Sequence, residues 1–235
     1  MSTQINIQNN IAAIQARIEA ACQLYQRQSP PILMAVTKTR NAAEISEAIA
    51  AGLTHLGENY LQEALDKQRQ LTSPELQWHF IGPIQTNKTR AIASHFDWVH
   101  SVDRAKIITR LNDQRPAELP PLNVCLQINL NDESSKAGIP ATDVIELAAL
   151  ALKQPRLILR GLMAIPVQTS NAQEQRQNFA ALENILTDLK NAFPQASLDT
   201  LSMGMSGDME SAIAEGATIV RIGSDIFGPR PTAKP

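Results

Sequence analysis

Residues 32–40 read ILMAVTKTR, and this stretch distinguishes between the two folds that suit the rest of the chain. Ile32–Val36 is a short apolar run typical of a buried strand, and helical periodicity follows it at Ile45–Ile49. An open doubly wound sheet usually carries a glycine-rich turn after its first strand. Val36–Arg40 contains no glycine, so the stretch favours a closed barrel of parallel strands.

Apolar or β-branched runs of the same kind recur along the chain, separated by segments with helical periodicity such as Val144–Ala148 and Phe179–Leu189. Successive runs begin about 20 to 40 residues apart, the length of one strand–loop–helix–loop unit. Eight such units in 235 residues predict an α/β fold, a (β/α)₈ barrel of the TIM type, which typically has about 250 residues. The eight runs are Ile32–Val36, Thr54–Gly57, Leu76–Ile81, Trp98–Val102, Leu122–Ile128, Leu157–Ile165, Leu198–Leu201 and Thr218–Ile222.

The segments outside these units are short. Residues 3–28 carry apolar side chains at helical spacing, without glycine or proline, which predicts an extra N-terminal helix ending before Pro30. No linker interrupts the body of the chain. We therefore expect one domain over residues 1–235, with Gly228–Pro235 as a loose tail.

Composition excludes several classes of protein. The net charge of −2, with both signs interspersed, argues against nucleic-acid binding, which concentrates basic residues on one face. We see neither a secretory signal nor an apolar run of the ~18 residues that a membrane span needs. Cys22 and Cys125 lie far apart in apolar surroundings, which indicates reduced thiols in a cytoplasmic protein. No heptad or exposed apolar stripe stands out, and we expect a monomer.

Polar residues follow most of the expected strands. Active sites of (β/α)₈ barrels lie at the C-terminal ends of the strands, so we expect these residues to meet at one mouth. They are Lys38, Gly57–Asn59, His79–Gly82, His100, Asn129, Gly161–Met163, Ser202–Gly204 and Arg221–Ser224.

Two of these residues are charged and follow or interrupt apolar runs. Lys38 is either an ordinary solvated lysine or a partly buried amine. In the second case, desolvation and a nearby cation would lower its pKa, so that the neutral amine can attack an aldehyde. Arg221 lies within the apolar run Ile219–Ile222 and needs a partner there. That partner is either an acidic side chain in the barrel or a ligand.

Two small-residue turns follow the last two runs, at Ser202–Gly207 and Gly223–Ser224. Barrels often bind phosphate with these loops, because glycine lets backbone N–H groups approach an anion. Helix capping by Ser206 and Asp208 is the alternative explanation.

The remaining polar positions are less specific. Asn59 either orients a ligand or caps the helix that begins at Tyr60, and His79 either faces the mouth or is a hydrogen-bonded core residue. The histidines lack the spacing of metal ligands. Residues 131–138 read NDESSKAG and are expected to form a polar flap.

The motifs together resemble the pyridoxal phosphate homeostasis proteins, a family of PLP-binding proteins related to the N-terminal barrel of bacterial alanine racemase. The resemblance runs from about residue 30 to residue 230, in the order of the family. The motifs that carry it are Met34–Thr39, Leu56–Tyr60, Trp78–Gly82 with Gln85–Lys88, His100–Asp103, Glu133–Gly138, Gly161–Met163, Ser202–Ser206 and Arg221–Gly228.

The resemblance implies a cofactor, pyridoxal 5′-phosphate (PLP), and a role for each matching residue. Lys38 would hold PLP as a Schiff base, an internal aldimine, with Asn59 beside the ring and Arg221 facing the pyridine nitrogen. The remaining implied site residues are His79 and Met163 at the mouth, and Ser202, Met203, Gly204, Ser206, Gly223 and Ser224 around the phosphate.

The implied function is non-catalytic. The protein would buffer and carry PLP, maintain vitamin B6 and amino-acid pools, and have PLP-requiring apo-enzymes as possible partners. A PLP-dependent racemase or decarboxylase is one alternative, and a cofactor-free lysine-dependent aldolase is another. We expect no efficient racemisation, because the chain ends at Pro235 without the additional domain that supplies a catalytic tyrosine in racemases.

Overall fold

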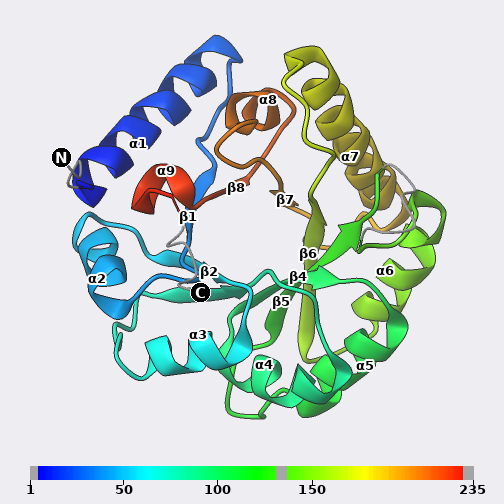
Figure 1. Cartoon of the computed structure of the whole chain (residues 1–235). Helices are drawn as coiled ribbons and strands as arrows, with labels where there is room; N and C mark the ends of the chain where they lie inside the picture. Colours follow the sequence, from blue (N-terminus) through cyan, green and yellow to red (C-terminus); the bar gives the residue numbers. More distant parts are fainter. Residues whose placement is uncertain (1–4, 131–136, 230–235) are drawn as a thin grey trace.

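Eight parallel strands alternate with helices and close into a barrel in the computed structural model, which describes residues 5–130 and 137–229 (Figure 1). The predicted (β/α)₈ architecture is confirmed. The strands are β1 Ile32–Val36, β2 His55–Glu58, β3 Gln77–Phe80, β4 Trp98–Val102, β5 Leu122–Ile128, β6 Leu157–Ala164, β7 Thr200–Ser202 and β8 Ile219–Ile222.

Helices surround the strands on the outside of the barrel (Figure 1). They are α1 Ile7–Leu24, α2 Ala42–Ala50, α3 Leu61–Gln68, α4 Thr89–His95, α5 Ala105–Gln114, α6 Val144–Leu152, α7 Ala172–Ala192, α8 Met209–Ala214 and α9 Ser224–Phe227, with short 3₁₀ turns at Thr86–Lys88 and Ala141–Asp143. No helix within residues 5–130 and 137–229 is long and apolar enough to cross a membrane.

The extra N-terminal helix is present as α1, which lies beside α8, α9 and α2. Its apolar stripe of Ile7, Ile11, Ile14 and Ile18 is buried, which explains why a helix outside the eight repeats remains attached. Tyr25 caps its C-terminus. The expected tail at 228–235 is described only as far as Pro229, and the expected flap at 131–138 only at Ala137 and Gly138.

Pairing of the first and last strands closes the barrel. In the parallel β1–β8 ladder Met34 lies opposite Arg221 and Ala35 opposite Ile222. The residues that follow both strands, among them Lys38 and Gly223, therefore emerge at the same end of the barrel. The strands have apolar packing on both faces. A continuous core lies between the strands and the helices, and a small cluster of Trp98, Cys125 and Met163 lies inside the barrel.

One strand differs clearly from its predicted bounds. The apolar run Leu198–Leu201 predicts a strand there, but β7 begins at Thr200, which lies opposite Gly161 of β6. The amide of Leu198 donates to Ala196 in a tight turn at 2.9 Å. Leu198 is buried because of its position under the helices, and burial alone does not make it a strand residue.

Candidate functional site

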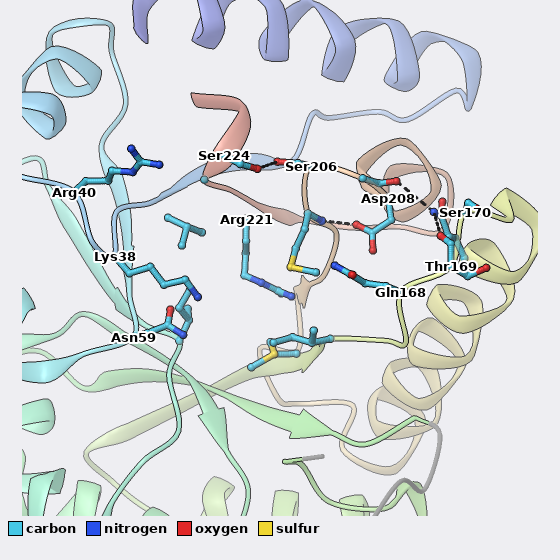
Figure 2. Close-up of a pocket in the computed structure, with 18 residues that line it drawn as sticks. Lys38, Arg40, Asn59, Gln168, Thr169, Ser170, Ser206, Asp208, Arg221 and Ser224 are labelled. Atoms are coloured by element: carbon cyan, nitrogen blue, oxygen red, sulfur yellow. Dashed lines mark hydrogen bonds between the residues drawn. The ribbon is translucent and has the colours of Figure 1, made fainter. Parts of the chain in front are cut away.

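A cavity of about 610 Å³ opens at the C-terminal end of the barrel (Figure 2). Its wall comes from the C-terminal ends of β1, β6 and β8, from the loops after β1, β2, β3, β6, β7 and β8, and from the start of α7. They are Val36, Lys38, Arg40, Asn59, Ile81, Met163, Ile165, Gln168, Thr169, Ser170, Gln175, Met205, Ser206, Gly207, Asp208, Arg221, Gly223 and Ser224.

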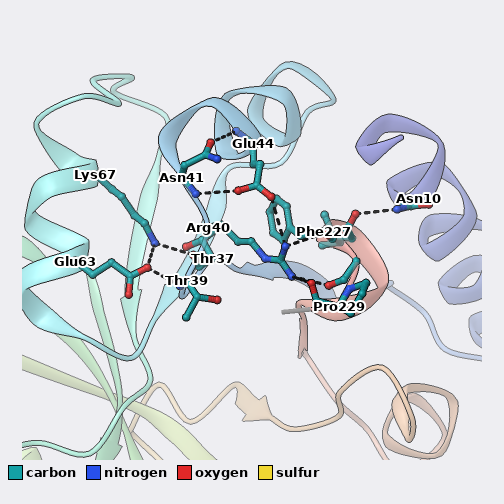
Figure 3. A network of polar contacts seen from close by, with 12 residues as sticks. Asn10, Thr37, Thr39, Arg40, Asn41, Glu44, Glu63, Lys67, Phe227 and Pro229 are labelled. Carbon is teal, nitrogen blue, oxygen red and sulfur yellow. Dashed lines mark hydrogen bonds and ion pairs between the residues drawn. The ribbon is translucent and has the colours of Figure 1, made fainter. Parts of the chain in front are cut away.

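The backbone on both sides of Lys38 is held by polar side chains beneath it (Figure 3). On one side, Thr37 donates its hydroxyl to Glu58 Oε1 at 2.6 Å and accepts from Lys67 Nζ through its carbonyl at 2.7 Å. On the other side, Thr39 has a left-handed φ of 65° and donates its N–H to Glu63 Oε1 at 2.5 Å. These contacts fix the point from which the Lys38 side chain enters the cavity.

Lys67 is the centre of that support. Its buried ammonium lies 2.6 Å from Glu58 Oε1 and 2.6 Å from Glu63 Oε1. Burial raises the pKa of Glu58, and the hydrogen bond and charge of Lys67 and the hydrogen bond from Thr37 oppose that increase. The second Glu58 oxygen, Oε2, is buried without a hydrogen-bond partner among the described residues. Breaking the Lys67 pair would therefore leave Glu58 almost wholly uncompensated.

Arg221 lies on the cavity wall and is only 4% exposed. Its guanidinium donates through Nη1 to the carbonyl and hydroxyl of Ser202 and through Nη2 to the Ala164 carbonyl at 2.9 Å. Burial lowers its pKa to about 10, while the Asp208 charge opposes the decrease, so Arg221 remains a cation at neutral pH. No acidic side chain of the described residues forms an ion pair with it.

Asn59 faces the cavity beside Lys38 (Figure 2). Helix α3 begins after Tyr60, which has no side-chain capping bond, so Asn59 does not serve as the expected helix cap. Its Oδ1 is buried and has no hydrogen-bond partner among the described residues. A buried amide oxygen in this state costs free energy until a ligand or water satisfies it.

The loops after β7 and β8 meet at the cavity rim. Ser206 Oγ and Ser224 Oγ lie 3.3 Å apart, and Asp208 accepts from the Met205 N–H at 2.6 Å, which closes the first loop on itself (Figure 2). Asp208 is the N-cap residue of α8, but its side chain makes no capping hydrogen bond to the helix. A Cβ on Gly223 would lie 3.2 Å from the Val36 carbonyl oxygen, so only a small residue fits between this loop and β1.

Comparison with known proteins agrees with this geometry. The sequence model of the family 'alanine racemase, N-terminal domain' matches residues 9–231 of this chain. A protein of Pseudomonas aeruginosa named pyridoxal phosphate homeostasis protein is 55% identical over 230 residues, 97% of this chain and 98% of the relative. The Escherichia coli K12 protein of the same name is 51% identical over 233 residues, 97% of this chain and 99% of the relative. The chain belongs to the family of pyridoxal phosphate homeostasis proteins.

A solved structure of a protein similar to this chain has the same architecture. PipY of Synechococcus elongatus, in a structure with PLP bound, is 37% identical, with a TM-score of 0.84, and the match covers 95% of this chain and 100% of PipY. Alanine racemase of Corynebacterium glutamicum is 15% identical, with a TM-score of 0.69 over 97% of this chain and 62% of the racemase, and it shows the fold alone.

The residues expected at the site fall into two groups. Those that line the cavity are Lys38, Asn59, Met163, Ser206, Arg221, Gly223 and Ser224. His79, Ser202, Met203 and Gly204 are outside its lining and lie deeper in the barrel. Ser202 reaches the cavity only through Arg221, and Gly204 accepts from the Arg221 N–H at 2.9 Å with its φ at 91°. Met203 is fully buried in the core.

Several lining residues were not identified from the sequence. Gln168, Thr169 and Ser170 follow β6, which ends at Ala164, one residue before the end of the predicted run Leu157–Ile165. Arg40 also lines the wall and donates to the carbonyls of Phe227, Gly228 and Pro229, so it joins the first loop to the last helix (Figure 3). The polar run Gln168–Ser170 after an apolar strand was the signal available.

The described residues include neither an exposed thiol nor a cluster of metal ligands. Cys22 and Cys125 are free and buried, and burial raises the pKa of both thiols. No group of three or more His, Cys, Asp or Glu in the described part of the chain is arranged to hold a metal ion.

Proposed function

We propose that this protein binds PLP reversibly in the barrel cavity and buffers and carries it, without catalysing a reaction of its own. One observation supports the proposal most directly. One cavity wall brings together an amine, a buried amide oxygen without a partner in the described part of the chain, a buried cation and two small-residue loops. They belong to Lys38, Asn59, Arg221 and the paired Ser206 and Ser224.

These residues match the groups of the cofactor. When bound, PLP supplies an aldehyde that condenses reversibly with a primary amine. Lys38 is the amine in this cavity, and Asn59 offers a donor and an acceptor to the ring hydroxyl. Arg221 places a permanent cation where the ring nitrogen would lie, which opposes protonation of that nitrogen. A ring without that proton is a weak electron sink, which disfavours amino-acid chemistry.

The phosphate would lie against the loops after β7 and β8. Ser206 and Ser224 offer hydroxyls there. Gly207 and Gly223 line the same part of the wall, and glycine lets backbone N–H groups approach an anion. Solved PipY contains PLP and is 37% identical to this chain, which supports the same cofactor here.

The cavity offers little for two-base racemisation, which needs a proton-transfer group on each face of the substrate carbon. No tyrosine or histidine lines the described wall. Tyr25 lies at the end of α1 and Tyr60 is exposed before α3. Besides Lys38, the remaining candidate on the wall is Asp208, whose carboxylate already accepts from Met205.

The proposal is tested by adding PLP to the purified protein and recording the visible absorbance of the carbon–nitrogen linkage, then adding a competing amine. We expect a new absorbance band that Lys38→Ala abolishes and that the amine reverses. Protein that binds no PLP, but cleaves phosphorylated aldols through Lys38, would instead establish the aldolase alternative.

The enzyme alternative needs a separate assay. PLP-loaded protein is incubated with several L-amino acids in D₂O, and deuterium at Cα and the D-isomer are measured. We expect exchange far slower than ordinary enzyme turnover of about 1–10³ per second. Turnover in that range, lost in Lys38→Ala, would contradict the carrier function.

We further propose that the barrel works as one domain and a monomer, and that it hands PLP to apo-enzymes. Sedimentation at micromolar concentration should give the mass of one chain, with or without PLP. Transfer is tested by mixing PLP-loaded protein with a PLP-requiring apo-enzyme and an excess of a trap for free PLP. Activation despite the trap supports direct transfer, and no activation contradicts it.

A further inference from the structure

A continuous chain of hydrogen bonds crosses the inside of the barrel beneath the cavity. His55 Nδ1 lies 2.9 Å from His79 Nε2, and His79 Nδ1 lies 2.9 Å from His100 Nε2. His100 Nδ1 lies 2.8 Å from Ser202 Oγ, which accepts from Arg221 Nη1 at 2.9 Å. Because His100 is on β4 and Ser202 on β7, which are not neighbours, their bond spans the barrel interior.

The surroundings hold the three rings, here called the histidine column, in place. Trp98 stacks on His79 with ring centroids 5.5 Å apart and an interplanar angle of 17°. His79 and His100 are fully buried, and His55 at the opposite end is partly exposed. Burial lowers the pKa of His79 and His55, and burial with the Arg221 charge lowers the pKa of His100 to about 3. The column is therefore neutral at physiological pH.

Each contact between two neutral imidazoles holds one proton, so the column has only two complete arrangements. In one, protons point from His55 toward Ser202. Ser202 Oγ then accepts from both His100 and Arg221, and no described residue accepts its own hydroxyl proton. In the other, Ser202 donates to His100, His100 to His79 and His79 to His55. In this second arrangement every buried polar hydrogen of the column and of Ser202 has a partner among the described residues.

The second arrangement also suits the positive charge of Arg221 at the Ser202 end of the column. Every ring then turns its lone-pair nitrogen toward the Ser202 end of the column and its N–H toward the opposite end. The negative ends of three dipoles therefore face the Arg221 cation. Aligned dipoles in a low-dielectric interior reinforce one another. They account for a buried guanidinium that has no carboxylate partner among the described residues.

We propose that His55, His79 and His100, all in the neutral Nε2–H form, are positioning residues that act through Ser202 to hold the Arg221 cation at the cavity wall. This deepens the proposed function, since Arg221 is the group that opposes protonation of the PLP ring nitrogen. A column without a fixed proton direction would leave the cation less firmly placed and its effect on the ring weaker.

The first test needs no cofactor. Long-range ¹H–¹⁵N spectra of the imidazole nitrogens resolve tautomers directly, and the chain has 4 histidines. His95 is exposed on α4 and serves as an internal reference. We expect Nε2–H for His55, His79 and His100 at pH 7. A column histidine found as the Nδ1–H tautomer or as imidazolium overturns the proposal.

The second test follows PLP labelled with ¹⁵N in its ring. His79→Phe keeps an aromatic ring against Trp98 and removes both column bonds, whereas the amide of His79→Gln can accept from His100 and donate to His55. We expect His79→Phe to bind PLP about tenfold more weakly and to protonate the ring nitrogen at higher pH. His79→Gln and the control His95→Phe should match wild type.

The outcomes separate the two proposals. If folded His79→Phe gives the wild-type ring-nitrogen titration, the column does not position Arg221, even if affinity falls. If His79→Phe fails to fold, the tautomers of the wild-type histidines decide the matter. If wild type binds no PLP, the proposed function fails while the tautomer measurement remains valid.

Discussion

At the scale of single residues, a second lysine, Lys67, holds the backbone on which Lys38 lies. The Lys67 ammonium contacts Glu58, Glu63 and the Thr37 carbonyl, which places three acceptors around one buried amine. The lysine that would react with PLP is therefore held by a second lysine that is fully engaged and does not line the cavity.

Lys67→Met should lower the free energy of unfolding by about 3–5 kcal/mol, because it leaves the Glu58 carboxylate buried without its cation. It should also weaken PLP retention, since the Thr37–Thr39 backbone loses part of its support. Arg69→Met is the matched control, because its pair with Asp66 is exposed, and it should cost at most about 1 kcal/mol. Denaturant unfolding measures the change in the free energy of unfolding for both variants. Equal effects of the two substitutions would contradict the role of Lys67.

At the scale of elements, α1 supports both loops proposed to bind phosphate. Arg17 donates to the Ser206 carbonyl at 3.3 Å and forms ion pairs with Glu210 of α8 and Asp225 of α9. The extra helix thus connects the end of β7 with the end of β8, across the outside of the barrel (Figure 1).

Arg17→Ala should therefore affect the cavity more than the fold. These ion pairs are partly exposed, so the free energy of unfolding should fall by only about 1 kcal/mol. Hydrogen exchange at residues 205–208 and 223–225 should accelerate, and PLP should bind more weakly. Unchanged exchange and PLP affinity would show that the helix does not support these loops.

The sequence predicted the elements better than it predicted their contacts. Trp98–Val102 and Leu122–Ile128 were identified with their observed bounds, because compact apolar runs lie between clear turn residues. The start of β7 was less predictable, because Leu198 is buried but lies outside the strand, which begins at Thr200. The histidine column joins β2, β3, β4 and β7, and no local pattern indicates which side chains face one another across a closed barrel.

At the scale of the whole molecule, the buried histidines predict acid sensitivity. The pKa of each column histidine is lower in the folded barrel than its ordinary value of 6.5. As the pH falls below 6.5, the unfolded chain takes up these protons first, so the free energy of unfolding decreases toward pH 3.

This decrease should reach a few kcal/mol, since one pKa unit corresponds to about 1.36 kcal/mol. His79→Gln removes one of the three titrations and should make the decrease shallower. Denaturant unfolding at several pH values between 7 and 4, compared with His95→Gln, gives the measurement. Parallel profiles for wild type and His79→Gln would mean that His79 is protonated as easily in the folded barrel as in the unfolded chain.

The central claim is that the cavity at the end of the barrel holds PLP on Lys38. The most direct measurement is borohydride reduction of PLP-loaded protein, followed by peptide mapping by mass spectrometry. We expect a pyridoxyl group on Lys38 alone among the lysines, and none after reduction of Lys38→Ala. A label on another lysine, with Lys38→Ala still binding PLP and showing its absorbance, would contradict it.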